Sequence, residues 1–100
     1  MNKRKKILLS ILKEFSEKRI PNENDYELSK NDFLEIVDMA QNAGYIQGAK
    51  FVRGGKGNKF ILGFFDGTIV TKKGLDYIDE NKIALKLYKE IKDWAEIVIP

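Results

Sequence analysis

Two short glycine-containing motifs, each next to a helical pattern, bracket a basic segment in the middle of this 100-residue chain. Gly44-Tyr45-Ile46 ends one helical pattern, and Thr71-Lys72-Lys73-Gly74-Leu75 begins another. The basic segment between them, residues 53–59, combines glycines with cationic side chains. This order of helix, basic turn and helix predicts a winged helix-turn-helix, an architecture whose default function is nucleic-acid binding.

The part before the basic segment predicts three helices, one of them short. The first covers residues 3 to about 18, and Ile20-Pro21 ends it. Asn22-Glu23-Asn24-Asp25 is typical of a loop that leads into a short helix. Ser29 is expected to cap the third helix, which ends at Gly44. The apolar stripe of the first helix consists of Ile7, Leu8, Ile11, Leu12 and Phe15, and that of the third of Phe33, Ile36, Val37, Ala40 and Ala43.

The rest of the chain predicts a small antiparallel sheet followed by two helices. Strands are expected at residues 45–52 and 59–62, and Asp66-Gly67 would turn the chain into a third short strand at 68–70. Thr71 would cap a helix that carries Leu75 and Ile78 inward and stops near residue 81. A last apolar stripe lies at residues 84–95. We therefore predict a single α+β domain over residues 1–100, with helices H1–H3, two or three strands with a basic wing, and two C-terminal helices.

Composition excludes most enzymes and cofactors. The chain has no cysteine and no histidine, so thiol nucleophiles, imidazole bases and disulfides are absent. We expect no enzymatic activity, no cofactor and no metal. The charged and apolar N-terminus resembles a secretory signal, but Lys13 and Glu14 interrupt the apolar run. No stretch approaches the ~20 apolar residues that span a bilayer. We expect a cytoplasmic protein with no membrane partner.

Charge alternates along the chain and places cations in the basic segment. Residues 21–47 carry one cation and six acids, whereas residues 48–60 carry four cations and no acid. A hairpin tip with several cations and little side-chain bulk can lie along a phosphate backbone. A solvated hairpin, in which the glycines only satisfy backbone angles, is the other interpretation. The candidate phosphate contacts are Lys50, Arg53, Lys56, Asn58 and Lys59.

The third helix offers a less favourable surface for DNA. With Phe33 in the core, the opposite face is expected to present Asn31, Glu35, Asp38 and Asn42. Asn31 and Asn42 could read adenine, and Lys30 is a third candidate groove contact, but two acids would have to approach a polyanion. A plain solvated face, or a surface for a protein partner around Glu35 and Asp38, explains the same residues.

Three further features leave alternatives open. Lys72 and Lys73 lie in the first turn of a helix, where the positive end of the helix dipole disfavours a cation. A bound anion would offset this unfavourable interaction, and so would screening by water. Phe64 and Phe65 are adjacent in a strand and point to opposite sides, so one of them could be exposed and belong to a protein interface. The last helix would pack on the first helix or form a homodimer through Leu87, Ile91 and Trp94.

Motifs spread over nearly the whole chain resemble the YjcQ family. The similarity rests on their order and spacing: Met1-Asn2-Lys3, Ile11-Leu12-Lys13-Glu14, Glu23-Asn24-Asp25, Gly44-Tyr45-Ile46-x-Gly48, Thr71-x-Lys73-Gly74, Tyr77-Ile78-x-Glu80-Asn81, Lys86-x-Tyr88-Lys89 and Ile91-Lys92-Asp93-Trp94. The resemblance implies a small winged-helix protein of bacterial or phage origin. It implies no site residues, because the family is described as uncharacterised. The basic turn looks longer and more basic than is expected for this family.

Together these features predict a small DNA-binding or transcription-associated protein that contacts double-stranded DNA through a basic wing. The rival interpretation is a protein-interaction module, which would use the acidic face of the third helix or the exposed part of Phe64-Phe65. The acidic helix favours the rival, and the basic wing favours DNA.

Overall fold

A computed structural model describes residues 2–82 of the chain. The predicted last helix and its homodimer contacts lie outside these residues. The described elements are α1 (Lys3–Ser16), a 3-10 helix η1 (Glu23–Tyr26), α2 (Lys30–Asn42), β1 (Ile46–Gln47), β2 (Lys50–Gly54), β3 (Lys59–Phe64), β4 (Ile69–Val70) and α3 (Lys72–Glu80). The fold is therefore α+β, with helices, short antiparallel strands and a further helix in the order that the sequence predicts.

Local capping signals place the ends of α2 and the start of α3. The Ser29 side chain accepts a hydrogen bond from the Asp32 backbone N–H, and the Thr71 side chain accepts one from Gly74 N–H. At the end of α2, Gly44 N–H donates to the Gln41 carbonyl and Tyr45 N–H to the Ala40 carbonyl. This pair of bonds is the Schellman arrangement, which stops a helix at a glycine. The predicted boundaries at Ser29, Gly44 and Thr71 are confirmed.

The four short strands within residues 2–82 form two separate two-stranded antiparallel sheets, so the strand after Asp66-Gly67 pairs with β1 and not with β3. Ile46 and Gln47 of β1 pair with Val70 and Ile69 of β4, and β2 pairs with β3. The single strand expected over residues 45–52 is wrong in this respect, because Gly48 interrupts it with a φ of +92°. A side chain at Gly48 would overlap the carbonyl of Gly67, so the two backbones approach here as only glycine allows.

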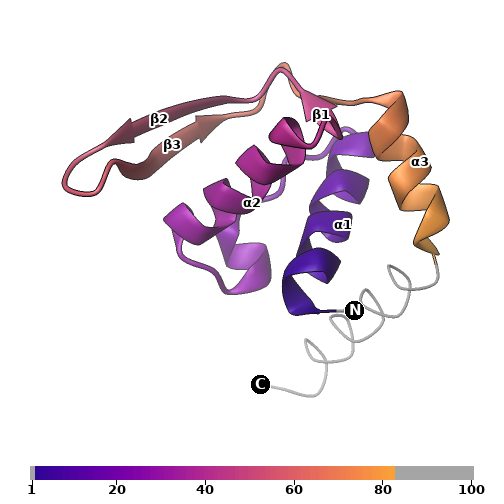
Figure 1. The fold of residues 1–100 in the computed structure, drawn as a ribbon, viewed down its shortest axis with the longest axis horizontal. Coiled ribbons are helices and arrows are strands. Elements are labelled where there is room, and N and C mark those ends of the chain that lie inside the picture. The colour runs from indigo at the N-terminus through magenta and orange to yellow at the C-terminus, as the bar shows by residue number, and fades with distance from the viewer. Residues whose placement is uncertain (1, 83–100) are drawn as a thin grey trace.

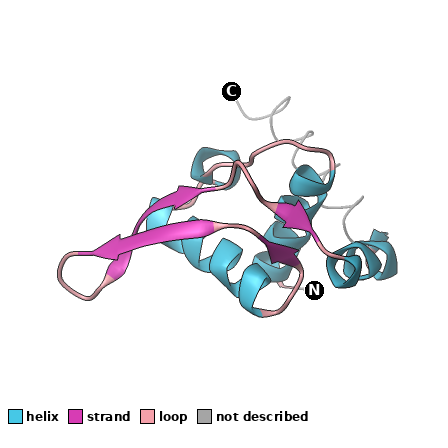
Figure 2. Cartoon of the chain, turned by 90° about the horizontal axis from the view of Figure 1, so that it is seen from above, coloured by secondary structure: helices cyan, strands magenta, loops and turns pink. Residues whose placement is uncertain are grey.

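The hairpin of β2 and β3 lies over α2 and reaches beyond it. Figure 1 shows the three helices side by side, with α1 between α2 and α3 and the hairpin above α2. Figure 2 shows the same hairpin from above, with its tip projecting past the helices at one end of the molecule. Packing of α2 against β3 and of α1 against both other helices holds this arrangement. It is compatible with a winged-helix-like fold.

An aromatic cluster joins the hairpin to the helices. The ring of Phe65 meets those of Phe15 in α1, Phe33 in α2 and Phe51 in β2, with centroids 5.7, 6.3 and 6.1 Å apart and steep interplanar angles. Such edge-to-face pairs add to the free energy of apolar burial. Leu9, Ile11, Leu12, Val37 and Ile46 are fully buried beside the cluster.

The prediction that Leu75 points inward is wrong. Its side chain is 49% exposed, whereas Ile78 on the same helix is buried. Leu75 lines an open groove of about 480 Å³ together with Ile20 and Ile69, at the end of α1. The helical period places Leu75 near the apolar stripe, but in the fold its side chain faces this groove and not the core.

Candidate nucleic-acid interface

The tip of the hairpin is a tight turn built from residues with left-handed backbone conformations. Gly55, Gly57 and Asn58 have φ values of +73°, +86° and +49°. Asn58 N–H donates to the Gly55 carbonyl at 3.2 Å, which closes the turn around Lys56. Glycine and asparagine tolerate this conformation best, and their short side chains leave the backbone accessible. The glycines therefore satisfy a structural need, and they also keep the tip slim.

Three lysines of the hairpin have no carboxylate partner among residues 2–82. Lys50, Lys56 and Lys59 are exposed, and none of them forms an ion pair with another described residue. Lys56 and Lys59 flank the turn at the projecting end, whereas Lys50 lies at the other end of β2, opposite Phe64. The projecting end therefore carries positive charge that no carboxylate in residues 2–82 neutralises.

Arg53 contacts other residues of the protein, which its position in the sequence does not indicate. Its guanidinium lies over the Phe60 ring, 4.0 Å from the centroid. An amino group of Arg53 also lies 3.7 Å from a carboxylate oxygen of Asp38 in α2. Cation–π and ionic contacts of this kind fix the guanidinium plane. Arg53 therefore fastens the hairpin to α2, although about half of its side chain remains exposed.

Amide side chains of α2 also hold the hairpin in place. The Asn31 carbonyl oxygen accepts from Phe60 N–H at 2.9 Å, and its amide donates to Glu35 at 3.2 Å. Gln41 accepts from Ala49 N–H at 2.8 Å and donates to the Ala49 carbonyl at 2.9 Å. The sequence marks Asn31 as a groove contact, but the structure places it against β3. Gln41 has no signal in the sequence that would reveal its role.

The four residues expected on the outer face of α2 are divided between two surroundings. Asn31 and Asp38 are half-buried against the hairpin, whereas Glu35 and Asn42 are exposed. Asn42 donates to Asp38 at 3.2 Å. Asp32 and Met39 are exposed on the same helix. We call Asp32, Glu35, Met39 and Asn42 the exposed stripe of α2. This stripe carries two carboxylates and no cation, so it would repel a phosphate backbone.

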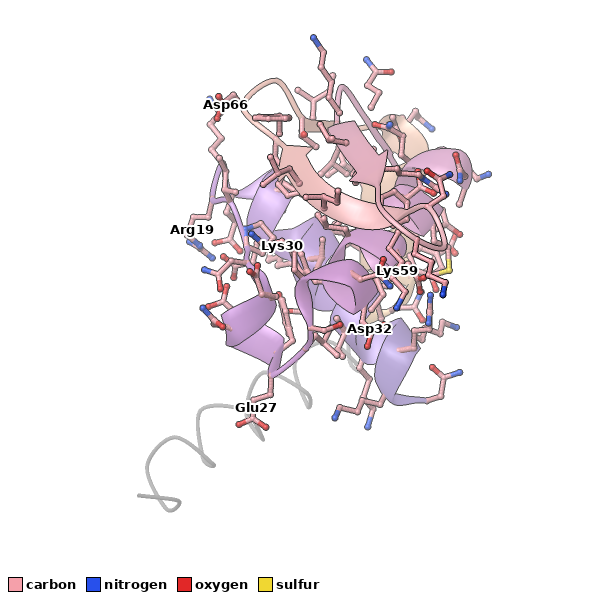
Figure 3. The ribbon with its side chains drawn as sticks, turned by 90° about the vertical axis from the view of Figure 1, so that its left-hand side faces the viewer. Arg19, Glu27, Lys30, Asp32, Lys59 and Asp66 are labelled. Carbon is pink, nitrogen blue, oxygen red and sulfur yellow. The ribbon has the colours of Figure 1, made fainter. Side chains whose placement is uncertain are left out.

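Lys30 lies on the same end of the molecule as Lys59. It precedes Asn31, whose bond to Phe60 brings the start of α2 beside the start of β3, where Lys59 is located. Figure 3 shows Lys30, Asp32 and Lys59 on the end of the molecule that the hairpin tip occupies. Lys30 is 3.9 Å from Glu23 and half-exposed, so part of its charge is neutralised. Lys30 and Lys59 thus lie on the same end of the molecule.

The two lysines at the start of α3 have acidic and aromatic neighbours. Lys72 lies 3.4 Å from Asp76, and the Lys73 ammonium lies 5.5 Å from the centre of the Tyr45 ring. Asp76 and Glu80 line the same shallow pocket. Burial, with smaller contributions from Tyr77 and Glu80, raises the pKa of Tyr45 above its ordinary value. Carboxylates therefore lie beside both lysines, and the anion contact at Lys72 and Lys73 stays a prediction.

Phe64 and Phe65 point to opposite sides of the hairpin, as strand alternation predicts. Phe65 is buried in the aromatic cluster, and Phe64 is 52% exposed on the other side of the hairpin.

Within residues 2–82 no helix is long and apolar enough to cross a bilayer. No group of three acidic side chains in the same residues could hold a metal ion.

The chain is similar to known sequences over almost its full length. A family model described as "YjcQ protein" matches residues 6–96. A Bacillus subtilis (strain 168) protein named "Uncharacterized protein YjcQ" is 36% identical over 100 residues, which cover 96% of this chain and 100% of that protein. No solved structure matches the chain significantly.

Proposed function

This chain belongs to the YjcQ family, and from that premise we propose that it is a winged-helix protein that binds double-stranded DNA through the tip of its β2–β3 hairpin. The order of α1, η1, α2, hairpin and α3 supports the winged-helix assignment, with α2 in the position of the recognition helix. The relative carries no functional description, so the proposal rests on this chain's own charges and geometry.

The observation that carries the proposal is the projecting, unneutralised charge of Lys56 and Lys59. A cation at the end of a slim hairpin reaches a phosphate without bringing the acidic stripe of α2 into contact with it. Lys30 adds a third cation at the same end, and the exposed Asn58 side chain can donate a hydrogen bond to phosphate oxygen. Each phosphate that is neutralised releases counterions and makes binding salt-dependent.

The proposed binding has little sequence preference. Base reading requires side chains with free donors and acceptors on the groove-facing side of a helix. The Asn31 carbonyl already accepts from Phe60 N–H, and Asp32 and Glu35 would oppose entry into the groove. Asn42 is the one amide on the exposed stripe of α2. The contacts are therefore with the backbone of the duplex, and we propose a binding role without enzymatic activity.

A protein-binding function is the second candidate, and the exposure of Phe64 favours it. The acidic stripe of α2 alone supports it less, because Met39 is its single apolar member and solvated carboxylates are common on helix surfaces.

The proposal is tested by titrating a random-sequence duplex of about 20 base pairs, long enough for several phosphate contacts, with the protein at two salt concentrations. We expect wild-type affinity to fall as salt rises. The Lys56→Ala/Lys59→Ala variant should bind more weakly at low salt, with a slope of log K against log[salt] that is smaller by about 2, near 0.9 per lost phosphate contact. Fluorescence anisotropy of labelled DNA measures both quantities.

A matched control removes two lysines from elsewhere on the chain. Lys18→Ala/Lys82→Ala changes the net charge equally but leaves the hairpin intact. We expect its salt slope to stay close to that of the wild type. Equal losses in the two variants would show that net charge alone drives binding, and absence of binding at low salt would refute the proposal.

A further inference from the structure

The side of the β2–β3 hairpin that faces away from α2 is apolar. In the register of the hairpin, Val52 pairs with Leu62 and Lys50 with Phe64, and Ile61 is the extra residue of a bulge. A side chain at Gly54 would meet Ile61, so Ile61 lies on this side as well. Val52, Ile61, Leu62 and Phe64 are 42% to 52% exposed. We call these four side chains the apolar hairpin face.

This exposure is not the ordinary polar side of a solvated strand. Antiparallel hairpins commonly bury one side and present polar residues on the other. Here Phe51, Phe60 and Phe65 make the buried side, yet the opposite side is also apolar. Contiguous exposed apolar side chains on a small protein mark interaction surfaces.

The charged side chains of the hairpin that carries the apolar hairpin face are all of one sign. Between Gly48 and Phe65 the chain carries four cations and no acid. Lys50 is next to Phe64 across the hairpin, and Lys56 and Lys59 lie at the tip. A second copy of this face would bring like charges together, and four half-exposed side chains fall short of the ~800 Å² per partner in a standard stable interface. A short segment with acidic residues fits both the size and the charge.

Single-stranded nucleic acid fits this surface less well. Its bases bind by stacking on aromatic rings. Phe64 is the single aromatic member of the face, and aliphatic side chains surround it. Aliphatic and aromatic side chains beside lysines instead match a peptide that combines apolar residues with aspartate or glutamate.

We propose that the apolar hairpin face is a docking surface for a short, acidic, amphipathic segment of another protein. Apolar residues of that segment cover Val52, Leu62 and Phe64, and its carboxylates pair with Lys50 and the tip lysines. The apolar side chains of this surface are distinct from the phosphate contacts proposed for the tip, whereas the tip lysines are common to both. The docking proposal does not depend on DNA binding.

The test is selection of binders from a random 16-residue peptide library displayed on phage, with the wild-type protein as bait. Enriched sequences should combine Leu, Ile, Phe or Met with an excess of Asp and Glu. A synthetic peptide from the selection should bind the Leu62→Thr/Phe64→Thr variant at least tenfold more weakly than the wild type. Threonine keeps strand propensity at these exposed positions, and thermal unfolding checks that the variant folds.

The control variant is Ile69→Thr/Leu75→Gln, which removes two similarly exposed apolar side chains outside the hairpin. Its peptide affinity should equal that of the wild type. Failure to enrich peptides, enrichment without acidic residues, or unchanged binding to Leu62→Thr/Phe64→Thr would overturn the proposal. So would a loss of duplex or single-stranded DNA binding in Leu62→Thr/Phe64→Thr, because the face would then contact nucleic acid.

Discussion

Replacing Phe65 by alanine is expected to lower the free energy of unfolding by about 4 kcal/mol, the middle of the range for buried phenylalanines. Phe65 is 9% exposed, and its ring touches those of Phe15, Phe33 and Phe51. The substitution removes apolar burial and leaves a cavity where α1, α2 and the hairpin meet. Because this one ring joins three elements, its loss also weakens the attachment of the hairpin.

The neighbouring residue provides the matched control. Phe64→Ala removes the same side chain from a half-exposed position, and we expect it to change the free energy of unfolding by less than about 1 kcal/mol. Urea unfolding followed by circular dichroism measures both variants. Equal losses at the two positions would contradict the assignment of Phe65 to the core and of Phe64 to the surface.

Replacing Gly74 by alanine is expected to destabilise the protein by about 2 kcal/mol, although alanine is the better helix former by ~1 kcal/mol. Gly74 lies in the first turn of α3, and a Cβ there would overlap the carbonyl oxygen of Tyr45 and press on Val70. The backbone of Tyr45 also accepts a hydrogen bond from Thr71 N–H at 3.0 Å, so it has little freedom to move away. Overlap therefore outweighs helix propensity.

Gly67→Ala is the control for this substitution. No atom lies within 4 Å of the position that its Cβ would occupy. We expect the midpoint of thermal unfolding to change little for Gly67→Ala and to fall by roughly 10 °C for Gly74→Ala, since about 2 kcal/mol shifts a domain of this size by that amount. A midpoint that rises in Gly74→Ala would refute the close contact between α3 and Tyr45.

The sequence predicts features that depend on neighbouring residues. Ser29 and Thr71 cap helices because a short hydroxyl side chain bonds to a backbone N–H three residues away, which the local sequence alone specifies. Gly44 ends α2 by the same kind of local bonding. The division of Phe64 and Phe65 follows from strand alternation in the same way.

Features that depend on contacts between distant residues could not be predicted. Gln41 and Ala49 bond across two elements, and Asn31 reaches Phe60 at a separation of 29 residues. The exposure of Leu75 depends on the groove that it lines with residues from other parts of the chain, such as Ile20 and Ile69. At the candidate site, the sequence locates the cations but not their partners. The contact between Arg53 and Asp38 exists only because the hairpin folds over α2.

The central claim is that duplex DNA contacts the hairpin tip, and NMR titration of ¹⁵N-labelled protein with a random-sequence duplex tests it most directly. We predict that the backbone amide signals of residues 55–59 shift most at low salt, and that those of the exposed α2 stripe, from Asp32 to Asn42, shift least. Added salt should reverse the shifts. Shifts centred on α2 or α3, or no shifts at low salt, would contradict the claim.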